Sequence, residues 1–286
     1  MLKITLNVIA WVLLIICILL IAAYITGRDK RAYSVLNPND VLKINGQTNT
    51  VQGFSSIYSP FVFKQIDVNT PPLLWIWYNA VDSGDHIDFI YYFVWENEIN
   101  PNPVIHSSYS IFRAFYYGYP LLDIEYFQVE VSKSDGKVVG MMFETGPSDD
   151  FYSIVNEHIV VRASMAPLSG YNVRYINRST GVEIKVTEII PQFTGSHVDV
   201  GVQTWNHLST LISAGNVLVY TKNITPNELK FLSDIDYSNY KFVRKSQGSH
   251  VTNEYKMGNI ISAIAIFIIV IIPAKIISNI KTSRRK

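Results

Sequence analysis

Residues 124–144 read IEYFQVEVSKSDGKVVGMMFE, the strongest hairpin signal in the chain. Apolar and polar residues alternate over 124–132, which is the period of a strand with two different faces. An Asp-Gly turn follows at 134–137, and VVGMMFE at 138–144 returns as the partner strand. This stretch predicts a β-rich domain in the middle of the chain.

Further strand-like segments flank this hairpin on both sides. They are LLWIWY (73–78), IDFIYYFVW (87–95), HIVVRAS (158–164), YNVRYI (171–176) and VEIKVTEII (182–190), with shorter candidates at 41–44 and 61–66. Turn signals separate them at the spacing of a β-sandwich or barrel. In the segment 182–190 we expect Glu183, Lys185 and Thr187 to face outward, because alternate strand residues share a face.

Helix signals are fewer in this central region. Residues 225–228 read TPNE, a capping box with proline at the first helical position, and they predict a helix through LKFLSDI at 229–235. A weaker helix is expected at 204–213, with one more strand at 214–222 between the two.

Both ends of the chain contain long apolar stretches. Residues 4–25 carry no charge, and a bilayer core takes about 20 helical residues to cross. A second apolar stretch runs from 257 to 274. We therefore expect an N-terminal transmembrane signal-anchor at 1–27, an extracytoplasmic β-rich domain at 28–256, and a C-terminal transmembrane helix with a basic tail at 257–286.

The charges indicate the orientation and the class of partner. The last six residues hold four basic side chains and no acid, which places that tail in the cytoplasm by the positive-inside rule. Two spans then put both termini inside and the central domain outside. That domain has 18 basic and 23 acidic residues, a net charge of −5, which does not favour nucleic-acid binding. The expected partners are the lipid bilayer and other membrane-protein subunits or a second copy.

The cysteine and the glycosylation sequons indicate little about function. The single Cys17 lies in the first expected span, so the central domain has neither an internal disulfide nor a cysteine nucleophile. Asn177 and Asn223 each begin a glycosylation sequon, a short pattern that often occurs by chance.

One cluster of acids surrounds a histidine between two predicted strands. It comprises Asp82, Asp85, His86 and Asp88. Carboxylates and imidazole bind divalent cations, but this spacing matches no metal-binding loop. Since aspartate is a common turn residue, we expect a solvated turn here.

A second grouping combines His106 with Asp123 and Glu125. The two acids stand two residues apart on a predicted strand and therefore share a face. They are the candidates for a divalent metal site or for acid–base catalysis, with no other cofactor indicated. A solvent-exposed sheet face explains the same alternation and is the favoured interpretation.

The third grouping is scattered along the sequence. It consists of His158, His197, Asp199 and His207, whose convergence the sequence alone does not test. The chain contains no metalloprotease, phosphate-binding, dinucleotide-binding or nucleophile-elbow motif.

Four segments, IDFIYYFVWENEINP, GYPLLDIEYFQVEV, DGKVVGMMFE and EHIVVRASMAPLSGY, follow in an order that resembles a known family. Residues 73–175 resemble the β-sandwich domains of vacuolar-sorting-associated and necrosis-inducing-like proteins. The resemblance implies a sandwich and matches Asp123 and Glu125 to the family's acidic pair, with Ile124 at a tryptophan position. The family's neighbouring histidine is replaced by apolar residues, and its Gln-His-Gly element reads Glu-Thr-Gly at 144–146.

The architecture favours a function in binding or assembly rather than catalysis. The leading hypothesis is a two-span membrane protein that presents a β-rich outer domain as an accessory or structural subunit of a membrane complex. The alternatives are a membrane-tethered, metal-dependent hydrolase that uses the acidic pair and a two-span channel subunit.

Overall fold

The computed structural model describes most of the central region. The described residues are 34–64, 71–97, 122–145, 159–166, 170–177, 180–202, 207–213 and 228–234, with Ile99, Pro103, His106, Ser107, Ser110 and Asp236. The expected membrane spans and Asn223 lie outside them. Among the described residues, no helix is long and apolar enough to cross a membrane.

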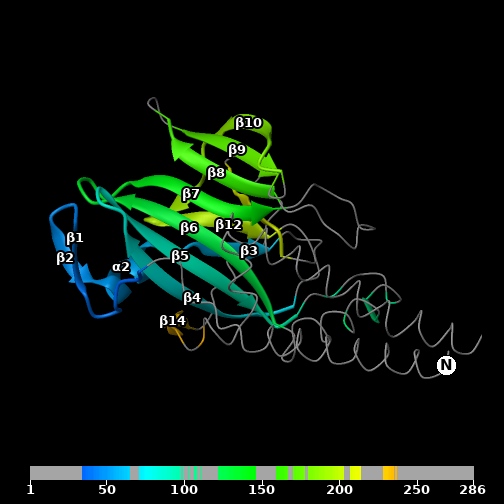
Figure 1. The fold of residues 1–286 in the computed structure, drawn as a ribbon, viewed down its shortest axis with the longest axis horizontal. Helices are drawn as coiled ribbons and strands as arrows, with labels where there is room; N and C mark the ends of the chain where they lie inside the picture. The colour runs from blue at the N-terminus through cyan, green and yellow to red at the C-terminus, as the bar shows by residue number, and fades with distance from the viewer. Residues whose placement is uncertain are drawn as a thin grey trace, which may run out of the picture. The chain divides into compact units, whose positions relative to one another are not determined.

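A large antiparallel sheet is built from strands in chain order (Figure 1). Its strands are β4 (Leu73–Asp82), β5 (His86–Trp95), β6 (Asp123–Ser132), β7 (Val138–Thr145), β8 (Ile159–Met165), β9 (Tyr171–Asn177) and β10 (Glu183–Ile189). Each strand pairs with the next one along the chain. The eighth strand, β14 (Leu229–Phe231), pairs in parallel with the outer edge of β4. The sheet therefore ends at β10 on one side and at β14 on the other.

A smaller sheet is centred on β12 (His197–Val202). It pairs antiparallel with β11 (Phe193–Thr194) and β13 (Ser209–Leu211), and in parallel with β3 (Phe61–Lys64). A separate hairpin, β1 (Val41–Ile44) with β2 (Gln47–Thr50), leads into the helix α2 (Val51–Tyr58). The Thr50 hydroxyl caps this helix by accepting a hydrogen bond from the Gly53 amide at 3.0 Å.

The core joins residues of both sheets and of α2 in one apolar cluster. Alternate aromatic residues of β5, including Phe89, Tyr91 and Phe93, face this cluster, and alternate valines of β12 face it as well. Neighbouring rings stack across the strands: Phe93 lies 6.1 Å from Phe127, which lies 5.2 Å from Phe143, between ring centroids. Each such side chain, when fully buried, contributes about 1.5–3 kcal/mol of hydrophobic stabilisation.

The mainly β architecture expected from the sequence is confirmed, and each strand predicted within 41–64, 73–95, 124–144 and 158–190 is present with small changes of boundary. The helix predicted at 204–213 is wrong within the described residues, and the helix predicted at 229–235 is wrong for 229–233, whereas Asp234 is helical. Residues 229–231 form β14, and residues 209–211 form β13.

Tertiary contacts explain why the capping box does not lead into a helix. The buried Asn79 amide donates to the Leu232 carbonyl at 3.1 Å, and the Leu232 amide donates to the Tyr78 carbonyl at 2.9 Å. These bonds hold the segment in extended form along β4. Pairing with a long strand thus overrides a local helix preference of a few tenths of a kcal/mol per residue.

Of the residues of β10 expected to face outward, Glu183 and Lys185 are exposed and Thr187 is partly buried. Ile184 and Val186, which alternate with them, are also exposed, by 55% and 52%. A register irregularity between Glu183 and Lys185 interrupts the alternation, and the Lys185 ammonium lies 5.9 Å from the centroid of the Tyr175 ring. Both faces of this end strand are therefore open to solvent over its first four residues.

Candidate functional site

Asp123 forms a buried contact with a histidine from the smaller sheet's side of the core. Its side chain accepts a hydrogen bond from Nδ1 of His207 at 2.7 Å. Asp123 is 4% exposed and His207 is fully buried. The His207 imidazole stacks on the indole of Trp95, with centroids 4.3 Å apart and planes 4° apart.

Two local features place these groups together. Trp95 and Asp123 are opposite residues of the paired strands β5 and β6, so their side chains lie on the same face. His207 has φ of 60°, in the left-handed region that residues other than glycine seldom adopt. This backbone conformation occurs just before β13 begins at Ser209. The fold therefore holds a strained residue in place through its side-chain contacts.

The chemistry of the pair follows from its hydrogen bond. Because the carboxylate accepts, Nδ1 of His207 carries the proton, and Nε2 is the second nitrogen of a fixed ring. Within the described residues, Nε2 has no hydrogen-bond partner. A carboxylate that orients an imidazole is a component of catalytic and metal sites, but here the ring is enclosed.

The structure gives Asp123 and His106, two members of the second predicted grouping, different partners. Asp123 pairs with His207 instead of His106, and His106 lies near the hydroxyl of Ser110, with Nε2 to Oγ at 3.4 Å. The interpretation of this face as solvent-exposed is wrong for Asp123, while Glu125 is half-buried. No group of three or more potential ligands among the described residues is arranged to hold a metal ion. The metal and catalytic roles of the three residues stay predictions.

The third grouping is divided between separate places. Nδ1 of His197 donates to the Ser59 carbonyl at 2.7 Å, and the His197 ring stacks on Phe61 with centroids 3.9 Å apart. Asp199 is buried and accepts from the Thr194 hydroxyl at 3.0 Å. His158 lies outside the described residues. Among the described members of this grouping, His207 contacts Asp123, and no local signal links residues 84 positions apart.

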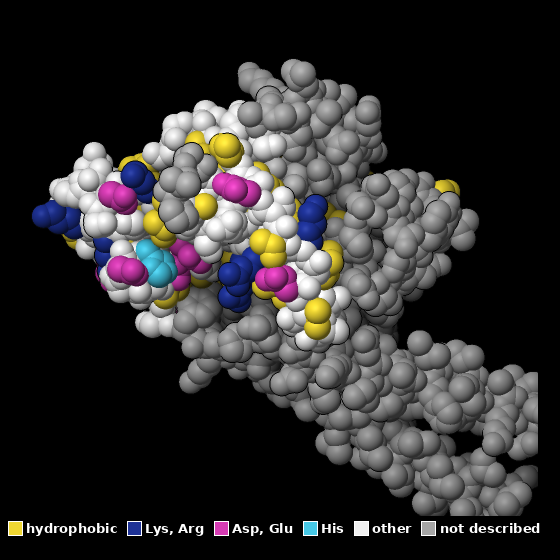
Figure 2. All heavy atoms as spheres, turned by 90° about the horizontal axis from the view of Figure 1, so that it is seen from above, with side chains coloured by type: hydrophobic (Ala, Val, Ile, Leu, Met, Phe, Trp, Pro, Cys, Tyr) yellow, Lys and Arg dark blue, Asp and Glu magenta, His cyan; other side chains and the backbone are white. Residues whose placement is uncertain are grey.

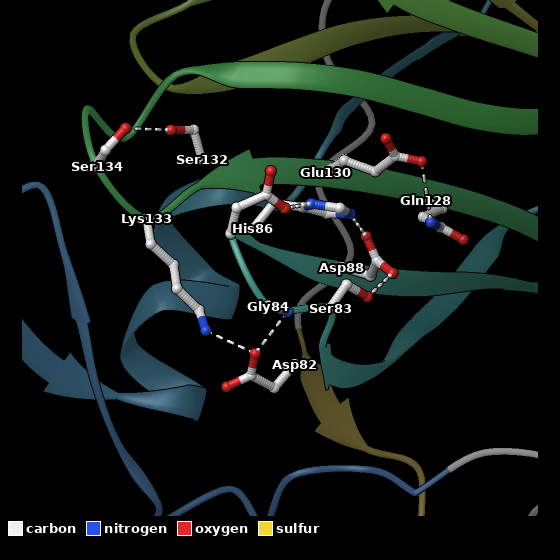
Figure 3. A network of polar contacts seen from close by, with 11 residues as sticks. Asp82, Ser83, Gly84, His86, Asp88, Gln128, Glu130, Ser132, Lys133 and Ser134 are labelled. Atoms are coloured by element: carbon white, nitrogen blue, oxygen red, sulfur yellow. Dashed lines mark hydrogen bonds and ion pairs between the residues drawn. The ribbon is translucent and has the colours of Figure 1, made fainter.

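The cluster at the β4–β5 turn forms a polar network (Figure 3). Nδ1 of His86 lies 2.5 Å from Asp85, and Nε2 lies 3.3 Å from Asp88. Asp88 also accepts from the Ser83 hydroxyl at 2.7 Å. The imidazole thus lies between two carboxylates of its own hairpin. The turn, which was expected from the sequence to be solvated, is held by these specific polar contacts.

This network also connects two hairpins. The Lys133 ammonium, from the β6–β7 turn, lies 2.6 Å from Asp82, and the Lys133 amide donates to the Asp85 carbonyl at 3.0 Å. An open hollow of about 480 Å³ lies between the turns and includes His86, Ser132 and Lys133 in its lining. The turn residues are therefore fixed relative to one another on an open surface.

The acid–base properties of the network depend on exposure. Burial lowers the pKa of His86, but the hydrogen bond to Asp85 and the nearby negative charges outweigh this effect and raise the pKa overall. The hydrogen bond from Lys133 lowers the pKa of Asp82, and the hydrogen bond to His86 lowers that of Asp85. Burial raises the pKa of Glu130, which lies further along the same face.

A row of side chains continues from this network along β6. Glu130 accepts from the Gln128 amide at 3.3 Å, and Gln128 in turn accepts from the Tyr126 hydroxyl. The row leads from the exposed turn to a second cluster of buried apolar residues, which includes Tyr92 and Tyr126. The rings of these two tyrosines meet edge to face, with centroids 6.0 Å apart. The sequence indicated the acids at the turn, whereas the role of Gln128 and Lys133 required the pairing of β5 with β6.

Asn177, the described sequon residue, lies at the end of β9. Its side-chain oxygen accepts from the Thr180 amide at 3.0 Å and so closes the β9–β10 turn. Glycosylation of this residue stays a prediction.

No protein-family model and no curated protein matches the chain. Similar solved structures are NLPPya in complex with glucosamine, 8% identical over 75% of this chain and 84% of the other, and Necrosis and Ethylene inducing Protein 2 from the causal agent of cocoa's Witches Broom disease, 9% identical over 75% and 86%. Both have a TM-score of 0.32, at which likeness carries no argument about fold or function. The necrosis-inducing and the vacuolar-sorting parts of the resemblance both stay predictions.

Proposed function

We propose that this chain is a two-span membrane protein whose outer β-rich domain serves binding or assembly. Segments 1–27 and 257–286 anchor it in the bilayer, both termini lie in the cytoplasm, and residues 28–256 lie outside. The uncharged stretch at 4–25 and the basic tail at 281–286 support this arrangement. The protein is an accessory or structural subunit of a membrane complex.

The exposed apolar surface around β10 is the observation on which the binding role rests. Val182, Ile184, Val186 and Ile190 are each more than half exposed, and they fall within nine consecutive residues. Single exposed apolar residues are ordinary, but a group of this kind marks an interaction surface.

Protease protection and co-purification test the proposal together. We expect the chain to remain in the membrane fraction after alkaline washing, and protease added to intact cells to degrade the domain at 28–256. Extraction in a mild detergent should then recover the chain with another protein or with itself. A domain that is cleaved only after lysis, or a chain released by alkaline washing, would refute the membrane arrangement.

A second candidate function is a membrane-tethered, metal-dependent hydrolase that uses Asp123, Glu125 and His106. The observation that favours it is the contact between Asp123 and His207, since a carboxylate–imidazole pair commonly supports a metal site. The described residues offer no complete set of metal ligands. Metal analysis of the purified full chain tests it: a stoichiometric metal that is lost in Asp123→Asn supports the hydrolase, and a metal-free chain removes it.

A further inference from the structure

The large sheet ends in two very different edges. β14 is three residues long, and its Lys230 forms an ion pair with Glu228 at 2.7 Å and lies 5.2 Å from the centroid of Trp75. β10 is seven residues long and carries exposed apolar side chains. Short, charged edges resist pairing with other chains, whereas long apolar edges favour it.

The outer edge of β10 is accessible to another strand. Among the described residues, no strand pairs with it. Figure 1 shows β10 as the last strand at the end of the sheet, and Figure 2, which views the molecule from that side, shows hydrophobic side chains at the surface beside charged ones. Both faces are exposed from Glu183 to Val186, so an added strand meets no part of the smaller sheet there.

Five of the seven residues of β10 form an edge that is regular enough to act as a template. From Lys185 to Ile189, β10 pairs residue by residue with β9, and the register irregularity lies before Lys185. A straight edge offers alternate backbone N–H and C=O groups to a new strand, and these bonds provide affinity in strand addition. The occupant is therefore an extended strand with apolar side chains.

We propose that this strand is β10 of a second copy, paired antiparallel about a two-fold axis at Val186. This inference rests on the proposed assembly role and names its partner. Pairing about Val186 sets this residue opposite its own copy and sets Lys185 opposite Thr187. No like charges are then opposed, whereas an axis at Lys185 or at Glu188 would oppose identical charges, which is destabilising.

The membrane anchor makes such a short contact effective. Two copies held in the same bilayer with the same orientation have a raised effective concentration, so a contact of one strand each suffices. The two-fold contact uses the β10 edge of both copies, and among the described strands of the large sheet it leaves the short β14 edges. It therefore closes as a dimer and does not extend into a filament.

The test is the oligomeric state of the full chain in mild detergent, measured by light scattering across a range of concentrations. We expect a dimer for the natural sequence and a monomer for Val186→Glu, because this change opposes two carboxylates at the axis. Within one copy the same glutamate faces Arg174 of β9, so the fold should tolerate it. Val41→Glu, at a residue of β1 that is 70% exposed, is the matched control and should remain a dimer.

Crosslinking keeps the test informative if Val186→Glu lowers expression. In a Cys17→Ser background, Val186→Cys should give a covalent dimer on oxidation, because opposed residues place their Cβ atoms about 4.5–5.5 Å apart. Val41→Cys should remain monomeric. A natural chain that is monomeric, or equal crosslinking at both positions, overturns the dimer. Recovery of a monomeric chain with a different protein would refute this inference and leave the proposed assembly function intact.

Discussion

The pairing of β5 with β6 carries a histidine–aspartate contact near each of its ends, and the two contacts differ in almost every respect. At one end, His86 lies between Asp85 and Asp88 in an open network. At the other, Asp123 holds His207 in the core beneath Trp95. The two contacts have similar lengths, 2.5 and 2.7 Å. We therefore expect burial, and not distance, to determine how much each contact contributes to the free energy of unfolding. In water an ion pair competes with hydration, whereas in the core a lost partner leaves a polar group unsatisfied.

Removal of the buried carboxylate should have the largest effect. Asp123→Ala leaves the His207 ring enclosed without its acceptor, and we expect the free energy of unfolding to fall by about 3 kcal/mol. Denaturant unfolding of the detergent-solubilised chain measures this. Asp85→Ala is the matched change at the exposed end and should leave the midpoint nearly unchanged. Equal losses in the two variants would contradict the role assigned to burial.

The backbone at His207 sharpens the comparison. His207→Ala and His207→Gly both remove the imidazole, but only glycine adopts φ of 60° without strain. We expect the alanine variant to be less stable than the glycine variant by about 1 kcal/mol. The same pair of changes at His86, whose strand conformation is ordinary, should reverse this order. Thermal unfolding of the four variants gives both differences.

The exposed end should respond to pH. Because the folded-state pKa of His86 is raised, its contribution to stability is fully present below the unfolded pKa of about 6.5 and is lost as pH rises through the folded value. The lowered pKa values of Asp82 and Asp85 act in the opposite direction: their contributions are present above about 4 and are lost as pH falls. Unfolding midpoints between pH 6 and 8 should decline in the natural chain and decline less in His86→Asn. An unchanged slope would show that His86 does not couple to folding.

The surface ion pair between Lys133 and Asp82 should have the smallest effect. Both side chains are partly exposed, so Lys133→Met is expected to cost about 0.5 kcal/mol or less despite the 2.6 Å contact. The loss should shrink further at 1 M salt, where screening is strong. If Lys133→Met lowered the free energy of unfolding as much as Asp123→Ala in the same denaturant series, the polar network between the turns would be a major source of stability, contrary to this prediction.

Much of the sheet could be predicted because its information is local. The strands of 124–144 and the Asp-Gly turn between them need only neighbouring residues, and they appear in the structure as β6 and β7. The strand at 229–231 needed a partner more than 150 positions away, so its capping signal was misleading. In β10, Glu183 and Lys185 are exposed as expected, but the exposure of Ile184 and Val186 depends on what packs against the strand and is not visible in its alternation.

The sequence indicated some residues of the candidate sites but not their partners. Asp123 was singled out because it stands on the strand with Glu125, but its partner His207 lies in the segment just before β13 and belongs to no motif. The turn at 82–88 was recognised as a polar cluster, whereas Lys133 joins it through hairpin packing. Spacing within one strand is visible in a sequence, while contacts between elements depend on the complete fold.

The chain order of the large sheet has a consequence for how the molecule forms. From β4 to β10, each pairing joins strands that are consecutive along the chain. Apart from the connections at 96–122 and 146–158, the loops between them are short, and closing a short loop has a low entropic cost. The parallel pairings of β14 with β4 and of β3 with β12 instead join distant segments. Nucleation should therefore occur within the consecutive hairpins, and these two long-range closures should set the folding rate.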